Sequence, residues 1–247
     1  MSDIENSPAS EDATVKKVPV KRVSKSHGVL SEKSLNAMKE ALKKYAKITE
    51  MAKSRNMNES DTSNIINDLL GEVLGYDKFF DVTTEYKIKG QYADYGVKID
   101  DKLSLIIEVK AMSVKLNENH IFQASSYAST EGVEWVILTN LEEWQVYHLS
   151  FGSRIDQELV LSFNLLEEAK SVKLIEKLAY LHKEAIKKWC LSRLWGQKVA
   201  TSGKNFKKVI TSQAVVKVIQ RELAKATNTK IGESDILEIL EDLFKDQ

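Results

Sequence analysis

The chain has 247 residues and a mass of 28.0 kDa, the size of one large domain or of one domain with an appendage. Its single cysteine, Cys190, excludes a disulfide framework and a zinc site of clustered cysteines. The sequence contains neither a run of about 18 apolar residues nor the apolar core of a signal peptide. We therefore expect a cytoplasmic protein.

The net charge is zero, but the charge is unevenly distributed. Residues 1–58 carry 12 Lys/Arg and 7 acids (net +5), residues 59–164 carry 8 and 18 (net −10), and residues 165–247 carry 16 and 11 (net +5). An acidic middle between basic flanks is compatible with a metal-dependent enzyme that acts on a polyanion. The signal is weak, because acidic faces are usually only solvated faces.

The N-terminal part is polar and then helical. Residues 1–30 contain both prolines and few large apolar residues, which predicts a disordered tail. Apolar residues at three- and four-residue spacings predict a helix over 31–56. A second helix is predicted after Asn58, and Gly75-Tyr76 ends it because glycine commonly follows the last turn of a helix.

The pattern then changes to alternation. Strands are predicted over 80–89, 93–99 and 103–109, with turns at Gly90 and Asp100-Asp101. A helix over 117–130 and strands over 133–139 and 143–149 follow. Beyond about Leu165 we predict helices near 165–195, 206–226 and 233–245. The fold class is therefore α/β: a helix, a three-strand meander, a helix and two strands, followed by a helical C-terminal region.

The most informative residues are Asp94, Glu108 and Lys110. Side chains alternate across a strand, so Glu108 and Lys110 lie on one face. If the turn places Ile99 opposite Leu103, Asp94 lies opposite Glu108, with Cβ atoms about 5 Å apart. Two carboxylates this close repel unless a cation separates them, and hard oxygen ligands favour Mg²⁺ or Mn²⁺.

This arrangement resembles the PD-(D/E)xK nuclease superfamily, and most closely the N-terminal nuclease domain of type I restriction enzyme R subunits. The resemblance covers about residues 57–150 and implies a restriction-endonuclease-like core. It rests on elements that occur in the same order here: the helix from Glu59 to Leu74-Gly75-Tyr76, Gly90 through Asp94-Tyr95, Glu108-Val109-Lys110, Gln123 to Tyr127, Leu138-Thr139-Asn140, and Trp144 to Tyr147.

The resemblance also implies roles for these residues. Asp94, Glu108 and the Val109 carbonyl would bind the metal ion, and Lys110 would orient or activate water. Gln123, Tyr127 and, less securely, Glu59 would support the site or position substrate. Taken alone, each signal has a plainer interpretation. Gln123 and Tyr127 share a helix face and could be a pair at the edge of the core, and Glu59 could serve the helix dipole.

A basic segment, 183–208, carries eight lysines and arginines and one acid, with Trp189, Trp195 and Phe206 between them. It could be an amphipathic helix with solvated lysines, or a surface that contacts DNA phosphates. The residues that we assign to nucleic-acid binding are Lys198, Lys204, Lys207 and Lys208.

We therefore predict four segments: a tail (1–30), an N-terminal helix (31–56), a nuclease domain (57–163) and a helical region (164–247). The predicted function is Mg²⁺- or Mn²⁺-dependent hydrolysis of DNA, in restriction, defence or mobile-element biology. The alternative is a catalytically silent nuclease fold that binds DNA or assembles with partners. Ser202-Gly203-Lys204-Asn205 is not a Walker motif, so ATP is not expected. The protein could also form a homo-oligomer or associate with a partner subunit, and the sequence does not decide between these two.

Overall fold

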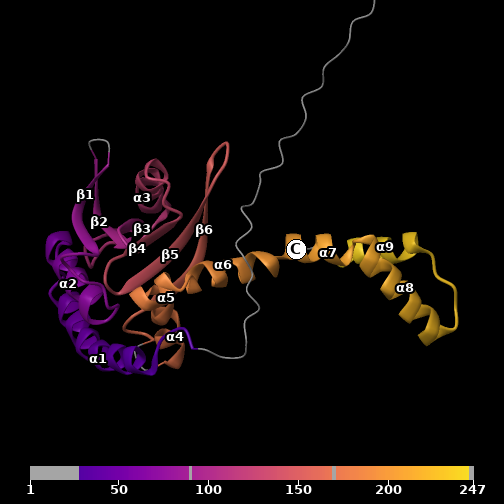
Figure 1. Cartoon of the computed structure of the whole chain (residues 1–247), viewed down its shortest axis with the longest axis horizontal. Coiled ribbons are helices and arrows are strands. Elements are labelled where there is room, and N and C mark those ends of the chain that lie inside the picture. Colours follow the sequence, from indigo (N-terminus) through magenta and orange to yellow (C-terminus); the bar gives the residue numbers. More distant parts are fainter. Residues whose placement is uncertain (1–27, 89–90, 169–170, 245–247) are drawn as a thin grey trace, which may run out of the picture. The chain divides into compact units, whose positions relative to one another are not determined.

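The computed structural model describes residues 28–88, 91–168 and 171–244 (Figure 1). They divide into two compact units, one ending at Lys187 and the other beginning at Lys188. The predicted tail up to residue 27 and the predicted turn at Gly90 lie outside the described residues.

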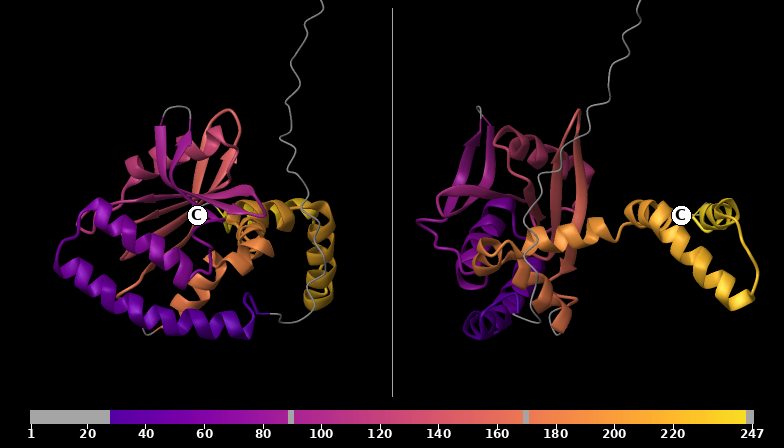
Figure 2. Two further views of the ribbon diagram at one scale, coloured as in Figure 1. Left: turned by 60° about the vertical axis from the view of Figure 1, so that its left-hand side comes forward. Right: turned by 45° about the vertical axis from the view of Figure 1, so that its right-hand side comes forward.

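The first unit is a six-stranded sheet with helices on both faces (Figure 2). Its helices are α1 (Glu32–Ser54), α2 (Glu59–Glu72), α3 (Glu118–Thr130), α4 (Val172–Leu181) and α5 (Lys183–Lys187). Its strands are β1 (Val82–Ile88), β2 (Gln91–Ile99), β3 (Lys102–Val109), β4 (Trp135–Thr139), β5 (Glu143–Phe151) and β6 (Ile155–Asn164).

The strands follow one another across the sheet in sequence order. The β1–β2–β3 meander is antiparallel, β3 and β4 are parallel, and β5 and β6 continue antiparallel. A parallel pair needs a crossover, and α3 provides it. This α/β architecture confirms the predicted fold class.

The final strand, β6, was not predicted; the sequence indicated two strands after α3, and the structure has three. Most of its side chains are exposed or half-buried because it is the edge strand, and Phe163 is buried. Leu159, Leu161 and Phe163 do alternate along its second half, but no element was predicted from the sequence between residues 149 and 165.

The sheet separates two layers of core. On one face, α3 packs Ile121, Ala124 and Ala128 against Ile106 and Leu138. On the other face lie α1 and α2 (Figure 2). The candidate site lies where β3 ends and the chain leaves the sheet towards α3.

The helix starts follow from capping residues. The side chains of Ser31, Asn58 and Asn117 accept backbone N–H groups of the first turns of α1, α2 and α3. Helix α2 ends as predicted: Gly75 adopts a φ of 74° and its N–H donates to the Gly71 carbonyl.

The second unit is helical, with α6 (Cys190–Ala200), α7 (Gly203–Ile210), α8 (Gln213–Thr227) and α9 (Glu233–Asp242). Its buried apolar cluster consists of Val216, Ile236 and Leu240, with partly buried neighbours around them. The helical C-terminal region is confirmed, but it is more broken than predicted. Ser212 interrupts the predicted helix over 206–226, because its side chain bonds the Val209 carbonyl where α7 ends.

Gly75 provides a test of the packing in the first unit, where the chain after α2 lies against the end of α4. A Cβ there would lie 2.7 Å from His182 Nε2, on a backbone that side chains rarely adopt. We expect Gly75→Ala to lower the free energy of unfolding by about 1–3 kcal/mol, measured by urea denaturation. The control is Gly71→Ala in α2, whose Cβ would meet its nearest neighbours at 3.5 Å and should be neutral or stabilising. Equal effects of the two changes would contradict this account.

Candidate nuclease site

The β2–β3 hairpin brings the predicted acids together. Its turn residues, Asp100 and Asp101, both have positive φ (49° and 63°), as a two-residue type I′ turn requires. The predicted pairing of Ile99 with Leu103 is wrong: this tight turn pairs Ile99 with Lys102. An irregularity after Val97 then shifts the register by one residue. Beyond it Tyr95 pairs with Ile107, so the next position places Asp94 across from Glu108, as predicted.

Short contacts connect the acids to the end of β3. Asp94 Oδ2 accepts the Val109 N–H at 2.7 Å, and Lys110 Nζ donates to Glu108 Oε1 at 2.7 Å. Glu59, in the first turn of α2, lies with Oε2 3.9 Å from Lys110 Nζ. The structure therefore gathers four of the predicted site residues, and Val109 with them, around the end of β3.

Glu108 is the unusual member of this group. The residue is only 4% exposed, and its second oxygen, Oε2, is buried without a hydrogen-bond partner. Burial and the charge of Asp94 raise the pKa of Glu108 from 4.5 to about 7, against the opposing effect of Lys110. Such a buried, unsatisfied carboxylate oxygen is costly in a folded protein, and its lone pairs are available to a cation.

Asp94 and Lys110 are also shifted from their ordinary behaviour. Burial raises the pKa of Asp94, and the negative charges of Glu59 and Glu85 raise it further. The hydrogen bond from the Val109 N–H and the positive charge of Lys110 act in the opposite direction. Burial acts to lower the pKa of Lys110, but the hydrogen bond to Glu108 and the surrounding acids outweigh it and raise this pKa. Lys110 is therefore a cation at neutral pH and cannot accept a proton from water in this arrangement.

Neighbouring elements hold these residues in place. The Lys110 N–H donates to the Thr139 carbonyl at the end of β4, and the Met112 N–H donates to the Met57 carbonyl just before α2. The Tyr95 hydroxyl lies 2.6 Å from both the hydroxyl and the carbonyl oxygen of Ser63, one turn after Glu59. The start of α2 is thus fixed beside the strand that carries Asp94.

Asn140 and Trp144, from the elements that carried the resemblance, have structural roles. Asn140 donates to the Val114 carbonyl and accepts the Glu143 N–H, which ties the loop after Lys110 to the β4–β5 turn. The buried Trp144 indole donates to the Leu141 carbonyl. These contacts support the site without contributing chemistry to it.

Gln123 and Tyr127 bond each other: Gln123 Nε2 donates to the Tyr127 hydroxyl at 2.8 Å. Tyr127 is 6% exposed and belongs to the core under α3, whereas Gln123 is exposed. Among the described residues, neither makes a hydrogen bond or ion pair to Asp94, Glu108 or Lys110. Their predicted role in positioning substrate stays a prediction.

The sequence-based site did not include His120 or Glu85. His120 Nδ1 is buried without a partner, and burial and the charge of Lys110 lower the pKa of this histidine. The signal was its spacing, since His120, Gln123 and Tyr127 at i, i+3 and i+7 share one face of α3. Glu85 lies between the pairs Thr84↔Tyr95 and Tyr86↔Ala93, near enough for its charge to raise the pKa of Asp94.

The donor set suits a hard cation. In the described part of the chain, no group of three or more His, Cys, Asp or Glu side chains is arranged to hold a metal ion. Any ion at this site would therefore depend on two carboxylates, Asp94 and Glu108, with backbone and solvent oxygens completing its shell. The unpartnered Glu108 Oε2 fits such an ion.

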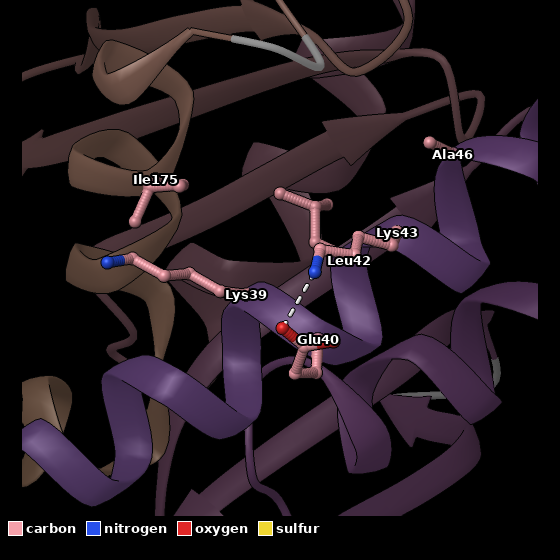
Figure 3. Close-up of a pocket in the computed structure, with 6 residues that line it drawn as sticks. All are labelled: Lys39, Glu40, Leu42, Lys43, Ala46 and Ile175. Atoms are coloured by element: carbon pink, nitrogen blue, oxygen red, sulfur yellow. Dashed lines mark hydrogen bonds and ion pairs between the residues drawn. The ribbon is translucent and has the colours of Figure 1, made fainter.

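A separate hollow lies between α1 and α4 and shares no residue with the acidic group. Its lining is Lys39, Glu40, Leu42, Lys43, Ala46 and Ile175 (Figure 3). The polar feature drawn there is an ion pair at 2.7 Å between Lys43 and Glu40, whose side chains are both about 70% exposed. An exposed pair of this kind is a surface contact, so the hollow offers no catalytic group.

The predicted nucleic-acid-binding lysines lie in the second unit. Lys204, Lys207 and Lys208 belong to α7, and Lys198 lies in the last turn of α6. Lys204 and Lys208 are exposed, and Lys207 is half-buried. Helix α7 thus presents two lysines one turn apart on one face.

Comparison with known families bears on this geometry. Residues 64–160 match the model of the family described as the type I restriction enzyme R protein N terminus. This segment is similar to that N-terminal domain. The match covers under half of the chain, confirms the resemblance inferred from the motifs, and indicates a nuclease-like, restriction-related role. No curated protein and no solved structure matched the chain. Among the described helices, none is long and apolar enough to cross a membrane.

The raised pKa of Glu108 predicts how stability changes with pH. Folded Glu108 binds its proton more tightly than unfolded Glu108, so the native state loses stability as pH rises from 4.5 towards about 7. Glu108→Gln removes this loss while its amide oxygen can still accept from Lys110. In metal-free buffer at pH 8 we expect the variant to unfold with a free energy higher by on the order of 1–3 kcal/mol.

The measurement is urea denaturation of both proteins between pH 4.5 and pH 8. The gain should shrink steadily towards pH 4.5, where Glu108 is largely protonated in the folded state and most of the pH-dependent loss has not yet occurred. Exposed Glu131, changed to Gln, is the control, and it should show no such trend. A gain that does not vary with pH would contradict the assigned titration.

Proposed function

We propose that the first unit hydrolyses phosphodiester bonds in DNA with the help of Mg²⁺ or Mn²⁺. The observation that carries this proposal is the unpartnered oxygen of buried Glu108, across from Asp94 and beside Lys110. Two acids at this distance repel each other, and Lys110 compensates only one oxygen of Glu108, yet the sheet holds the pair in place. The match to the N terminus of restriction enzyme R proteins supports the same chemistry.

The ion would be held by the Asp94 and Glu108 carboxylates and, by the resemblance to this nuclease family, by the Val109 carbonyl. When bound, it would supply Lewis-acid stabilisation of charge on the phosphate oxygens. The Asp94–Val109 hydrogen bond supports this assignment, because it fixes one carboxylate beside the backbone at the end of β3.

The chain's own residues would do the rest. Hydrolysis requires a positioned water and neutralisation of the non-bridging phosphate oxygens. Lys110, held as a cation by Glu108, can donate to a phosphate oxygen or to the attacking water. Glu59, half-exposed and 3.9 Å from Lys110, orients that ammonium. Gln123, exposed on α3, can donate to the DNA backbone while Tyr127 anchors it.

The alternative is a nuclease fold that has lost catalysis and serves to bind DNA or to assemble with partners. The specific observation in its favour is the Glu108–Lys110 bond, which occupies both residues with each other. The intact set of Asp94, Glu108 and Lys110 favours the enzyme, because a silent fold has no need to keep two acids in mutual repulsion.

Cleavage of plasmid DNA with Mg²⁺ or Mn²⁺ tests the proposal. We expect Glu108→Ala to reduce the cleavage rate by at least about 10³-fold, as expected for removal of a charge-stabilising group. Circular dichroism should show an unchanged fold. The matched control is Glu131→Ala, an exposed acid at the end of α3, which should cleave at the wild-type rate. Wild-type activity in Glu108→Ala would exclude the assigned chemistry, and a silent wild type would favour the alternative.

DNA capture would depend on the second unit. Residues 59–164 carry a net charge of −10, which repels a polyanion, whereas residues 188–230 carry ten Lys/Arg and a single acid. The proposed contacts are Lys198, Lys204, Lys207 and Lys208.

Reversal of the three α7 lysines, Lys204, Lys207 and Lys208, to Glu should weaken DNA binding. The slope of log K against log salt should fall by about 0.9 for each phosphate that the variant no longer neutralises. Fluorescence anisotropy at several salt concentrations measures both effects. The control is reversal of Lys33, Lys43 and Lys47, exposed lysines of α1, which should change neither. An unchanged slope in the α7 variant would mean that these lysines only solvate the helix.

A further inference from the structure

The second unit carries an apolar surface that its own helices leave uncovered. Phe206 and Val209 of α7 are 52% and 60% exposed, and Ile239 and Leu243 at the end of α9 are 59% and 66% exposed. The rings of Phe206 and Phe244 lie 6.2 Å apart, which joins the two helices at this point. We call Phe206, Val209, Ile239 and Leu243 the α7–α9 surface.

This surface is distinct from the lysine face of the same helix. Successive residues of a helix are rotated by about 100°, so Phe206 and Val209 share one side of α7, and Lys204 and Lys208 share the other. Helix α9 is arranged in the same way. Ile239 and Leu243 border the buried Ile236 and Leu240 and extend the apolar stripe beyond the part that α8 covers.

The unit buries too little to dispense with this surface. Three apolar side chains, Val216, Ile236 and Leu240, form its fully buried cluster, and α7 buries none of its residues. Helical units this small usually need additional apolar contacts to be stable. A covering partner would supply such contacts, and a second copy of the chain is the partner that is always available.

The charge of the unit also fits a second copy. Residues 188–230 hold ten Lys/Arg and one acid, whereas residues 231–247 hold six acids and one lysine. A two-fold axis places the same surface of both copies face to face, so the acidic α9 of one copy can approach the basic side chains of α8 in the other. The two signs lie in different helices, so such pairing is self-complementary.

We propose that the protein is a homodimer in which the α7–α9 surface of one copy packs against that of a second copy. The lysine face of α7 stays outside this interface. The proposal is independent of nuclease activity, because the test measures the molecular mass of the protein in solution.

Sedimentation equilibrium of the full chain between about 1 and 100 μM is the first test. We expect a mass of about twice 28.0 kDa, and a melting temperature that rises with concentration. A monomer over this whole range would overturn the proposal, and a different protein or another part of the same chain would then cover the surface.

Variants test the location. Ile239→Glu combined with Leu243→Glu should raise the dimer dissociation constant by at least about 100-fold, because it places charges in an apolar interface. The control is Phe80→Glu combined with Val172→Glu, two exposed apolar residues of the first unit, which should remain dimeric. If the first variant fails to fold by circular dichroism, Val209→Glu on the other helix gives the same test. A dimer that both surface variants preserve would overturn the assigned interface.

Discussion

The register of the β2–β3 hairpin is the constraint on which the candidate site depends. The type I′ turn pairs Ile99 with Lys102, and continuing that pairing would place Asp94 opposite Ile107. Asp94 and Glu108 would then lie on opposite faces of the sheet, because a one-residue slip reverses the face of every side chain. The irregularity after Val97 adds one residue and returns both carboxylates to the same face. A single local bulge therefore decides whether two acids are near each other at all.

That proximity has an electrostatic cost, and the fold accepts it. Glu108 is buried with one oxygen unsatisfied, and its hydrogen bond to Lys110 compensates the other oxygen only. Removing a charge from water without a full set of partners destabilises a protein, and the neighbouring Asp94 adds repulsion. The surrounding hydrogen bonds, from Val109 to Asp94 and from Lys110 to Thr139, hold the strand ends against this repulsion. Rigid support around an unfavourable charge arrangement is characteristic of functional sites.

The sequence alone predicted the elements that have strong local signals. Asn58 caps α2, Gly75 ends it, and the Asp100-Asp101 turn joins two alternating strands, so these elements could be located within a few residues. The edge strand β6 was missed because its first half is polar and its apolar residues, Leu159 to Phe163, run directly into the segment that was predicted to be helical. The bulge after Val97 escaped for a different reason: pairing register depends on both strands together, and no residue type announces it. The candidate site divides in the same way. Alternation on one strand fixes the relation between Glu108 and Lys110, whereas only the packing of α3 on the sheet brings His120 near Lys110.

The distribution of charge between the two units bears on the proposed binding of DNA. Charges on a protein surface are screened within about 10 Å at 0.1 M salt, so the acidic surface of the first unit repels DNA mainly where the two touch. At the acidic pair itself, the Lys110 ammonium is a neighbouring positive charge, and it is hydrogen-bonded to Glu108. The basic helices of the second unit need not neutralise the acids directly; contacts elsewhere along the DNA add to affinity just as well. Under the proposed binding of DNA, local neutralisation of the acids and overall affinity are thus separable tasks.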